Sequence, residues 1–259
     1  MNKEYKNPGT ANEFGYEWDI YREILPVHRI QFQNWIKPFE IDDFKGKSFI
    51  DAGCGIGRNS YWPLKAGAKS CFAFDFDHRT VAVAKHNLKE FSNAEIKFQS
   101  IEDLSIENKF DIAFSIGVIH HLENPKLAVR NLYNTLKNNG VLILWVYAQE
   151  GNELYLFFLK LIRLITSRIP LPITRFVAKI ATLFLWIFLR FFSYNKYLRM
   201  IKRFSFRHLE SIVFDQFLPS IANYWTKEQV LGLIDELKFK NVNINHTNNY
   251  SWTIICEKI

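Results

Sequence analysis

The fold of this chain is decided by the stretch Phe49-Ile50-Asp51-Ala52-Gly53-Cys54-Gly55-Ile56-Gly57. Its apolar start is typical of a buried parallel strand, and its glycines predict a tight loop that opens a helix. Glycine suits such a loop because it adopts positive φ and lets a ligand approach the backbone closely. We therefore expect a ligand site where this strand ends.

The spacing of the glycines narrows the class of ligand. The dinucleotide fingerprint G-x-G-x-x-G would need a third glycine at position 58, which is Arg58. The spacing is instead G-x-G-x-G, and Asp51 stands two residues before the first glycine. A carboxylate repels a pyrophosphate but attracts a cation, so the loop suits a positively charged ligand. The other interpretation is a glycine-rich turn that binds nothing.

With Asp51 and the three glycines, this stretch resembles motif I of the class I S-adenosylmethionine-dependent methyltransferases. The methionyl part of that cofactor carries an ammonium and a sulfonium but no phosphate, which fits an acid at position 51. The chain looks like the small-molecule enzymes of the type 11 and type 12 groups. The resemblance implies an α/β fold, a Rossmann-like seven-stranded and mostly parallel sheet with helices on both faces.

The resemblance also assigns the cofactor, S-adenosylmethionine, to particular residues. Asp51 would hold its methionyl end, and Asp75, 22 residues after Gly53 (75 − 53), would bind the ribose hydroxyls. Asp77 is the rival acid, but we expect it to cap the next helix. The other predicted cofactor contacts are Gly53, Cys54, Gly55, Gly57, Phe76, Ile101, Glu102, Ser115 and Ile116.

Two features at the expected site leave questions open. Ser100 stands where the family usually has an acid for the adenine amino group, although a hydroxyl accepts the same bond. After a predicted strand at 110–115 the chain reads His120-His121-Leu122, which resembles a family segment near the methyl donor. If the acceptor is a hydroxyl, one of these histidines would act as general base. Alternatively, one packs and the other orients the loop.

Hydrophobic patterns and cap signals predict the other elements. Asn124 with Pro125, and Thr226 with Gln229, predict helix starts. The expected strands are 47–52, 70–74, 95–99, 110–115, 141–147, 241–246 and 252–258. The expected helices include 57–67, 78–91, 153–168 and 227–238. We divide the chain into an N-terminal helical cap at 1–45, a core at 46–151 and 221–259, and a helical insert at 152–220.

Composition indicates a globular protein of the cytoplasm. The chain has 259 residues and is rich in aromatics, with 24 Phe, 7 Trp and 11 Tyr. Its cysteines, Cys54, Cys71 and Cys256, lack metal-ligand spacing, so we expect free thiols in a reducing compartment and no metal site. The polar stretch Met1–Trp18 does not resemble a signal peptide.

The net charge of +7 is concentrated in the insert. The span Leu154–Leu209 has no Asp or Glu, so the rest of the chain carries 22 basic and 26 acidic residues. That span holds eleven basic residues: Lys160, Arg163, Arg168, Arg175, Lys179, Arg190, Lys196, Arg199, Lys202, Arg203 and Arg207. A mildly acidic core therefore carries one basic and very apolar insert.

Two interpretations of the insert remain open. Its longest uncharged run, Ile180–Leu189, has ten residues, and a spanning helix needs about 20, so we do not expect a transmembrane segment. The insert is either a helical lid over the acceptor pocket or an anchor whose Lys and Arg at 153–207 meet an anionic membrane surface. In the second case the protein is peripheral on the inner face of the membrane.

Three functions follow from these patterns. The first is transfer of a methyl group from S-adenosylmethionine to the O or N of a small, amphiphilic acceptor, such as a lipid, a quinone or a lipid-linked saccharide. The second is a non-catalytic or regulatory, membrane-associated protein that binds the cofactor. A nucleic-acid methyltransferase is less well supported, because aliphatic residues interrupt the basic charge and no motif for a flipped base is present.

Overall fold

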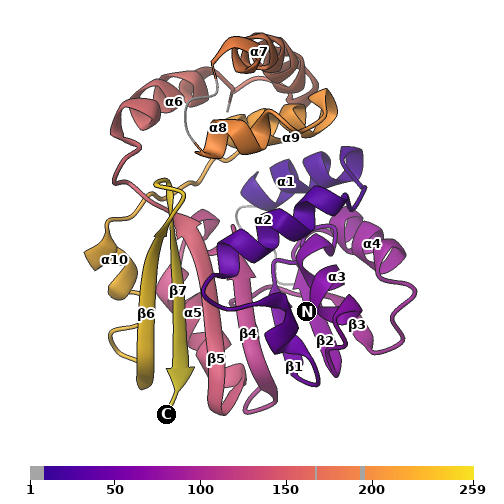
Figure 1. The fold of residues 1–259 in the computed structure, drawn as a ribbon, viewed down its shortest axis with the longest axis vertical. Coiled ribbons are helices and arrows are strands. Elements are labelled where there is room, and N and C mark those ends of the chain that lie inside the picture. The colour runs from indigo at the N-terminus through magenta and orange to yellow at the C-terminus, as the bar shows by residue number, and fades with distance from the viewer. Residues whose placement is uncertain (1–8, 167, 193–195) are drawn as a thin grey trace. The chain divides into compact units, whose positions relative to one another are not determined.

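The computed structural model describes residues 9–166, 168–192 and 196–259 (Figure 1). The first eight residues of the predicted cap, and positions 167 and 193–195 of the predicted insert, lie outside this part of the chain. The strands are β1 (Ser48–Ala52), β2 (Ser70–Asp75), β3 (Ala94–Phe98), β4 (Phe110–Ile116), β5 (Leu136–Tyr147), β6 (Phe239–Thr247) and β7 (Ser251–Lys258).

The described residues also form α-helices. They are α1 (Gly9–Ile20), α2 (Pro26–Ile36), α3 (Arg58–Lys65), α4 (His78–Asn87), α5 (Pro125–Thr135), α6 (Glu153–Thr166), α7 (Leu171–Phe191), α8 (Lys196–Ile201), α9 (Phe206–Phe217) and α10 (Lys227–Leu231). Two short 3₁₀ helices, η1 and η2, cover Ile41–Phe44 and Ile119–His121.

The strands form one sheet in the order β3-β2-β1-β4-β5-β7-β6. The first five strands in this order pair in parallel, whereas β7 pairs antiparallel with both β5 and β6. All five residues of β1 are buried, as expected for a central strand covered on both faces. The predicted seven-stranded, mostly parallel, Rossmann-like fold is therefore confirmed.

Successive residues of a strand point to opposite faces of the sheet, so β1 contributes to two cores. Phe49 packs in a cluster with residues of α2, α3 and α4, and Ile50 packs in a second cluster with residues of α5. Figure 1 shows helices on both sides of the sheet. Both clusters consist of residues from 22–152 and 221–259 alone.

The chain forms two compact units. The sheet unit consists of Arg22–Asn152 and Ile221–Ile259, and the insert unit consists of Glu153–Ser220 with the chain up to Tyr21. Helix α1 belongs to the insert unit because it packs on α9, where Tyr16 meets the ring of Phe214 edge-on. The N-terminal segment is thus divided after Tyr21, rather than continuing as one cap to residue 45.

The predicted cap residues of three helices are confirmed. Asp77 accepts hydrogen bonds from the first turn of α4, Asn124 caps α5, and Thr226 forms a capping box with Gln229 at α10. The predicted length of α10 is wrong, because the helix ends at Leu231 instead of 238 and Gly232 follows as its C-cap. β5 also begins earlier than predicted, at Leu136.

Helix α7 is longer than the uncharged run Ile180–Leu189, from which we expected no transmembrane segment. Among the described residues it is the one helix long and apolar enough to cross a membrane by length and composition. It has 21 residues and an 18-residue window with a mean hydropathy of 1.6. Arg175 and Lys179 do not interrupt the helix, so the ten-residue run from Ile180 to Leu189 was too narrow a measure. Length and composition alone are weak evidence for a span, because core helices of soluble proteins pass the same test.

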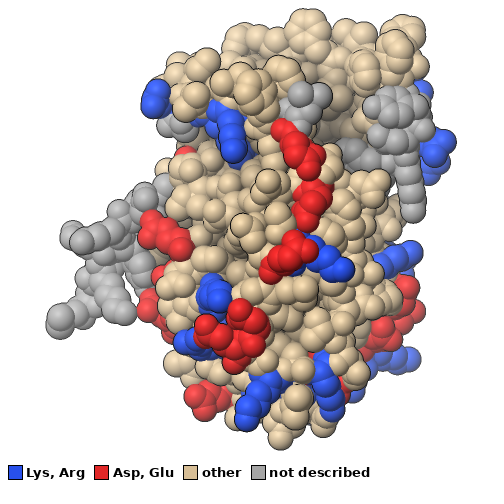
Figure 2. Space-filling model, turned by 90° about the vertical axis from the view of Figure 1, so that its left-hand side faces the viewer, with Lys and Arg blue, Asp and Glu red and all other residues tan. Residues whose placement is uncertain are grey.

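The surface is divided in character. Large exposed hydrophobic side chains gather on α6 and α7, for example Ile165, Phe184 and Phe191. On the face drawn in Figure 2, charged side chains are sparse in the upper part of the view and frequent in the lower part. Within the sheet unit, exposed Lys and Arg pair with acids, as Arg130 does with Glu236 at 2.7 Å.

Candidate functional site

The predicted site residues follow the carboxyl ends of four neighbouring parallel strands. The glycine loop follows β1, Asp75 ends β2, the segment 99–104 follows β3, and His120 and His121 follow β4. Because β1 lies between β2 and β4, the chain leaves β1 and β4 toward opposite sides of the sheet. Ligands of open α/β sheets bind in the crevice at such a switch point.

Positive φ and close neighbours favour glycine at positions of this loop. Gly53, Gly55 and Gly57 all have positive φ, at 76°, 55° and 81°. A Cβ on Gly53 would lie 2.4 Å from Cγ2 of Val118, which closes the loop from the side of β4. The amides of Gly53 and Cys54 both donate to the Phe74 carbonyl at 2.9 Å, so the loop is anchored to β2.

Asp51 is a buried acid beneath this loop. Asp51 is only 1% exposed, and its Oδ2 atom accepts a hydrogen bond of 2.6 Å from Ser60 Oγ. Burial raises the pKa of this carboxyl to about 7, and the Ser60 bond opposes the shift. A buried carboxylate is stabilised by a cation, so the position fits the charged end of a ligand.

Asp75 and Asp77 have different roles in the structure. Asp75 Oδ2 accepts the Gly55 amide at 2.9 Å, and burial raises the pKa of its carboxyl to about 6. Asp77 instead accepts the Arg79 and Thr80 amides at the start of α4 and pairs with the Arg79 guanidinium at 2.7 Å. Asp75 is therefore the acid at the loop, and Asp77 is a helix cap.

Aromatic rings lie where β2 and β3 end. The Phe76 ring stacks on Phe98 with centroids 5.2 Å apart, and His78 stacks on the same ring at 3.8 Å. Sequence reasoning missed Phe98 and His78, because their meeting depends on the pairing of Asp75 with Phe98 between the two strands. A flat ligand ring would find π-faces here.

The loop after β3 is fixed from α5. Asn131 Nδ2 donates to the carbonyls of Ile101 and Glu102 at 3.0 and 2.9 Å, and Ile101 is buried whereas Glu102 is exposed. Ser100 Oγ accepts the Glu102 amide at 3.2 Å. Asn131 is a second residue that the sequence did not reveal, since it lies about 30 positions from the loop that it holds.

Ser115 and Ile116 contribute to the site differently from the other predicted residues. The Ser115 hydroxyl donates to the Ala52 carbonyl at 2.9 Å, so its side chain ties β4 to β1. Ile116 is buried in the core cluster on the side of α2. A contact of either residue with a ligand would therefore come from the backbone near Gly117, which has a φ of 79°.

The two histidines lie on η2, and both are buried. The His120 ring lies against the Tyr147 ring at an interplanar angle of 34°, with centroids 3.9 Å apart. The Nδ1 atom of His121 lies 2.7 Å from the Ile221 carbonyl. Since a carbonyl only accepts, Nδ1 of His121 carries the hydrogen and Nε2 is the basic nitrogen.

The segment that opens the C-terminal part of the chain covers this histidine pair. The Asn223 amide and side chain both donate to the His120 carbonyl, at 2.8 and 3.2 Å. The Tyr224 ring stacks on Tyr147 at 5.3 Å. An aromatic enclosure therefore forms where β4 and β5 end, beside the glycine loop that Val118 contacts.

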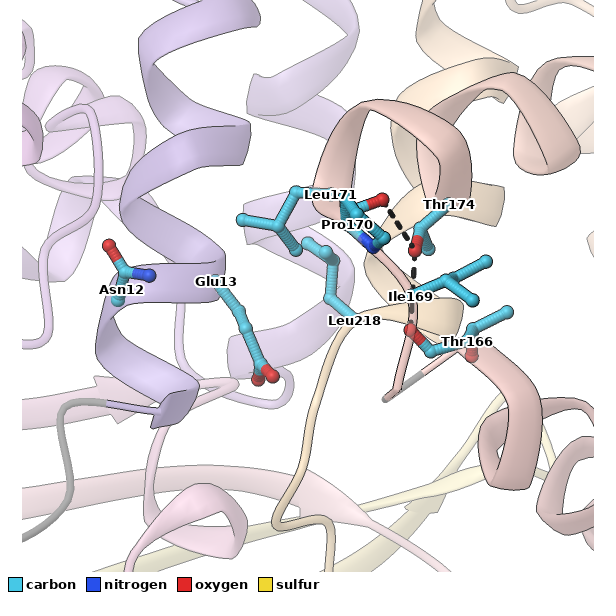
Figure 3. A pocket seen from close by; sticks show the side chains of 8 residues that line it. All are labelled: Asn12, Glu13, Thr166, Ile169, Pro170, Leu171, Thr174 and Leu218. Atoms are coloured by element: carbon cyan, nitrogen blue, oxygen red, sulfur yellow. Dashed lines mark hydrogen bonds between the residues drawn. The ribbon is translucent and has the colours of Figure 1, made fainter.

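A small cavity of about 240 Å³ lies in the insert unit and contains none of the predicted cofactor residues (Figure 3). It is lined by Asn12, Glu13, Thr166, Ile169, Pro170, Leu171, Thr174 and Leu218. Its polar groups already have protein partners: Glu13 accepts the Ser220 amide, and Thr174 Oγ1 donates to the Thr166 carbonyl. The cavity is a gap at the turn between α6 and α7, not a site for the cofactor.

The three cysteines are free and buried, as the sequence predicted. Burial raises the pKa of the Cys256 thiol to about 12 and that of Cys54 well above its ordinary range, so neither thiol is reactive near neutral pH. Within the described part of the chain, no group of three or more His, Cys, Asp or Glu side chains is arranged to hold a metal ion.

Comparison with known proteins identifies the central segment. A family model described as a methyltransferase domain matches residues 50–144. Over 121 residues the chain is 29% identical to the tRNA U34 carboxymethyltransferase of Alteromonas mediterranea. This alignment covers 44% of this chain and 36% of the relative. Over 163 residues it is 28% identical to the ubiquinone biosynthesis O-methyltransferase of Pelagibacter ubique. That alignment covers 55% of this chain and 68% of the relative.

Solved structures share the fold. Human N-acetylserotonin methyltransferase in complex with SAM aligns with a TM-score of 0.59 at 12% identity, over all of this chain and 60% of that one. A SAM-dependent methyltransferase from Aquifex aeolicus aligns with a TM-score of 0.53 at 11% identity, over 98% of this chain and 100% of that one. The chain spans about a third of the length of the tRNA-modifying relatives that it matches.

Proposed function

Residues 50–144 are a methyltransferase domain of the class I S-adenosylmethionine-dependent family, and on that premise we propose that the chain methylates a small, amphiphilic acceptor. One observation carries the proposal. The glycine loop, the buried Asp51 and the half-buried Asp75 meet at the carboxyl ends of β1 and β2. The acceptor class we propose is a lipid, a quinone or a lipid-linked saccharide, methylated on O or N.

The residues at this edge fit the cofactor of the family. Asp51 would attract the cationic methionyl end, and the glycines of the loop, all with positive φ, would let its backbone approach the ligand closely. Asp75, at the tip of β2, would accept hydrogen bonds from the ribose hydroxyls. The rings of Phe76 and Phe98, with Ile101 and Glu102, would enclose the adenine. The backbone near Ser115 and Ile116, together with Cys54, would line the sulfur side.

The protein's main task would be alignment. The bound cofactor supplies an electrophilic methyl group, and the side chains around it hold the acceptor atom in line and exclude water. His121 is the better candidate for general base, because its Nδ1 donates to the Ile221 carbonyl and Nε2 then has the lone pair in the neutral ring. His120 would position that loop through its ring contact with Tyr147.

The insert supports an amphiphilic acceptor. Its helices α6 and α7 expose large hydrophobic side chains, and its basic residues have no acids between them in the sequence. The relative that acts in ubiquinone biosynthesis is consistent with an acceptor that has a lipid tail. We place the protein in the cytoplasm, peripheral on the inner face of the membrane.

A nucleic-acid acceptor is the second candidate, and the names of the tRNA-modifying relatives favour it. The match to those proteins covers the methyltransferase domain and only 36% of their length. The alignment therefore gives no information on the remaining segments of those proteins. The charge of the insert would serve RNA binding, but its exposed hydrophobic residues would not.

Calorimetric titration with S-adenosylmethionine at pH 8 tests the cofactor site. We expect micromolar binding of S-adenosylmethionine and none of NADH. The matched variants are Asp75→Asn and Asp77→Asn, since both remove one charge from neighbouring positions and keep an acceptor oxygen. The first should weaken binding about 10- to 100-fold, because it removes charge-assisted bonds, and the second should leave affinity unchanged.

The pH dependence of binding sharpens this test. The pKa of Asp75 is raised to about 6, so the carboxylate needed for the ribose is lost as pH falls through that value. Asp51, whose pKa is raised to about 7, loses its charge first, so affinity should fall through pH 7 in both the parent protein and Asp75→Asn. The further fall through pH 6 should occur in the parent protein alone. Equal affinities of the two asparagine variants would reject the ribose assignment.

Methyl transfer is measured separately with three acceptor preparations: quinols and lipids in detergent, a lipid-linked saccharide, and tRNA. Incorporation of labelled methyl into one of the first two supports the proposal. Incorporation into tRNA alone would replace it with the second candidate. Cofactor binding without transfer to any acceptor would favour a non-catalytic, regulatory protein.

A further inference from the structure

The insert unit exposes an apolar surface that the proposed chemistry does not use. Among the described residues, 21 large hydrophobic side chains are exposed, and all but four of them lie between Tyr155 and Phe192. The four others are scattered singly, at Ile30, Phe98, Val242 and Ile259. A continuous apolar surface of this extent marks an interaction site, whereas single exposed residues need no explanation.

Both helices of this surface are mounted on α9. Arg163 of α6 donates to the Gln216 carbonyl at 2.8 Å, and Thr166 Oγ1 donates to the Phe217 carbonyl at 3.0 Å. Arg175 of α7 pairs with the buried Glu210 at 3.1 Å. The faces of α6 and α7 that carry these bonds are therefore fixed on protein, and their opposite faces remain exposed.

The exposed face of α7 is a regular stripe. Thr174, Ala178 and Thr182, spaced by four, are buried on the inner side. The outer side is formed by Ile173, Phe176, Ile180, Phe184, Ile187 and Phe191, spaced by three and four, and each is at least 44% exposed. This spacing produces a broad apolar face on one side of a helix.

Positive charge borders this apolar face. Lys179 and Arg190 are exposed on α7 between its outer and inner sides, and the Arg190 guanidinium lies 4.3 Å from the centre of the Trp186 ring. Trp and Arg together favour the boundary between hydrocarbon and headgroups, where each has an apolar body and a polar tip. The exposed bases of the insert are Lys160, Arg168, Lys179, Arg190, Arg199, Lys202, Arg203 and Arg207.

We propose that the outer faces of α6 and α7 dock on an anionic lipid bilayer, with both helices lying in the plane of the interface. The exposed aromatic and aliphatic side chains would enter the acyl region, and the flanking Lys and Arg would meet anionic headgroups. The bilayer would deliver the amphiphilic acceptor, a link that rests on the proposed function. The docking itself depends only on this surface.

An in-plane orientation fits the structure better than a span by α7. Arg175 and Lys179 stand four and eight residues from the start of the helix, so a span would carry them roughly 6 and 12 Å inward. Charged groups at that depth are costly. A span would also draw α9 with it, because the Arg175–Glu210 ion pair joins the two helices.

A second copy of the chain fits this surface less well than an anionic bilayer. Two such faces would bring Lys160, Lys179 and Arg190 of each copy together, with no acid from the span Leu154–Leu209 to balance them. Like charges oppose that approach, whereas anionic headgroups supply the missing counter-charge. The charge pattern therefore selects the bilayer as the partner.

Vesicle flotation of the full-length protein tests the proposal. We expect the protein to float with phosphatidylcholine vesicles that contain a quarter phosphatidylglycerol in 50 mM salt. It should bind phosphatidylcholine alone at least tenfold more weakly, and 0.5 M NaCl should remove most of that difference because salt screens the headgroup attraction. No flotation at low salt, or equal binding to both vesicles, would overturn the proposal.

Matched variants separate the apolar and the charged parts of the surface. Ile165→Asp with Phe184→Asp should lower binding to the anionic vesicles at least tenfold, whereas Ile30→Asp on α2 should change it less than twofold. Lys179→Gln with Arg190→Gln should lower it about tenfold and spare binding to neutral vesicles. The control is Lys85→Gln, on α4, with Lys89→Gln, just beyond the end of that helix. All seven positions are exposed, so these variants should fold.

Three further outcomes would overturn the proposal. Resistance to alkaline carbonate extraction from cell membranes would mean that α7 spans the bilayer. A dimer in sedimentation that Ile165→Asp with Phe184→Asp dissociates, without vesicle binding, would mean that a second copy covers the face. Unaltered flotation of that variant would remove the apolar face from the mechanism. Titration of the same preparations with S-adenosylmethionine reports on the methyltransferase site independently.

Discussion

At the scale of single residues, the site combines the buried Asp51 and the half-buried Asp75 with a loop whose glycines have positive φ. Asp51 and Asp75 lie close enough for the charge of Asp75 to raise the pKa of Asp51, in addition to the larger effect of burial. Without a bound cation, the ionised pair opposes folding. A protein keeps such an arrangement when the ligand supplies the positive charge, so this cost is consistent with a binding site.

Asp51→Asn should therefore stabilise the fold while weakening cofactor binding. The pKa of Asp51 rises from 3.8 to about 7 on folding, so the neutral form is favoured in the native state. Relative to the asparagine variant, the parent should lose stability as pH rises from about 4 to about 7 and stay level above that. At pH 8 we expect the variant to be more stable by about 2–4 kcal/mol in urea titrations.

Asp42→Asn is the control for this experiment, because it changes an exposed aspartate and should alter stability by less than about 0.5 kcal/mol. If the two asparagine variants showed the same pH dependence, burial of Asp51 would not be the cause. Cofactor affinity, measured on the same samples, should fall only in Asp51→Asn.

His121→Ala should remove a proton acceptor and leave the cofactor site intact. With a hydroxyl acceptor we expect kcat to fall by about 10²- to 10⁴-fold and the rising limb of the pH–rate profile to disappear. Affinity for S-adenosylmethionine should change little. His86→Ala, on the exposed side of α4, is the matched control. Normal turnover of His121→Ala would assign the residue a structural role.

At the scale of elements, the sequence predicted what is encoded locally. The glycine loop after β1, the caps at Asp77 and Asn124 and the capping box at Thr226 all depend on residues within a few positions of each other. For the same reason the alternation of strands and helices, and with it the seven-stranded sheet, could be predicted. The assignment of cofactor roles to those residues remains a prediction.

The features that the sequence did not predict depend on distant residues. Phe98 reaches Phe76 and His78 only through the register of β3 on β2, and Asn131 reaches back to the loop at Ile101. The tautomer of His121 depends on the Ile221 carbonyl, 100 residues away. Local patterns carry no information on such pairs, so the fold has to be known before these residues can be named.

Helix α7 shows how a local measure can mislead. Counting uncharged residues gives only Ile180–Leu189, whereas the helix extends from Leu171 to Phe191. Arg175 and Lys179 do not end the helix, because they lie away from its outer apolar side. What a helix does with its apolar residues depends on which side is covered. Only the packing of Thr174, Ala178 and Thr182 shows that the other side is free.

At the scale of the whole molecule, the predicted cofactor residues and the exposed apolar surface belong to different compact units. All predicted cofactor residues and both large core clusters belong to the sheet unit. The insert unit has a small core of its own, which includes Leu156, Leu189, Leu209, Phe214 and Phe217. Since neither core cluster of the sheet unit includes residues from the insert unit, the sheet unit should fold without it.

The last prediction follows from that division. A variant that joins Arg22–Asn152 to Ile221–Ile259 through a short Gly/Ser linker should unfold in one cooperative transition, and S-adenosylmethionine should raise its Tm. The ends to be joined are held in the sheet unit, because Asn152 donates to the Ala148 and Tyr250 carbonyls and Ile221 accepts from His121. The same variant should not float with anionic vesicles.

Cofactor binding and vesicle flotation of the joined variant should be compared with those of the full-length protein that carries Ile165→Asp and Phe184→Asp. If both proteins bind the cofactor and neither floats, the surface and the cofactor site are separable, and the insert serves to bring the domain to the acceptor. If the joined variant aggregates or shows no shift in Tm, the sheet unit needs the insert to complete its site. Helices α6 to α9 would then act as a lid as well, since they would contribute to cofactor binding in addition to meeting the membrane.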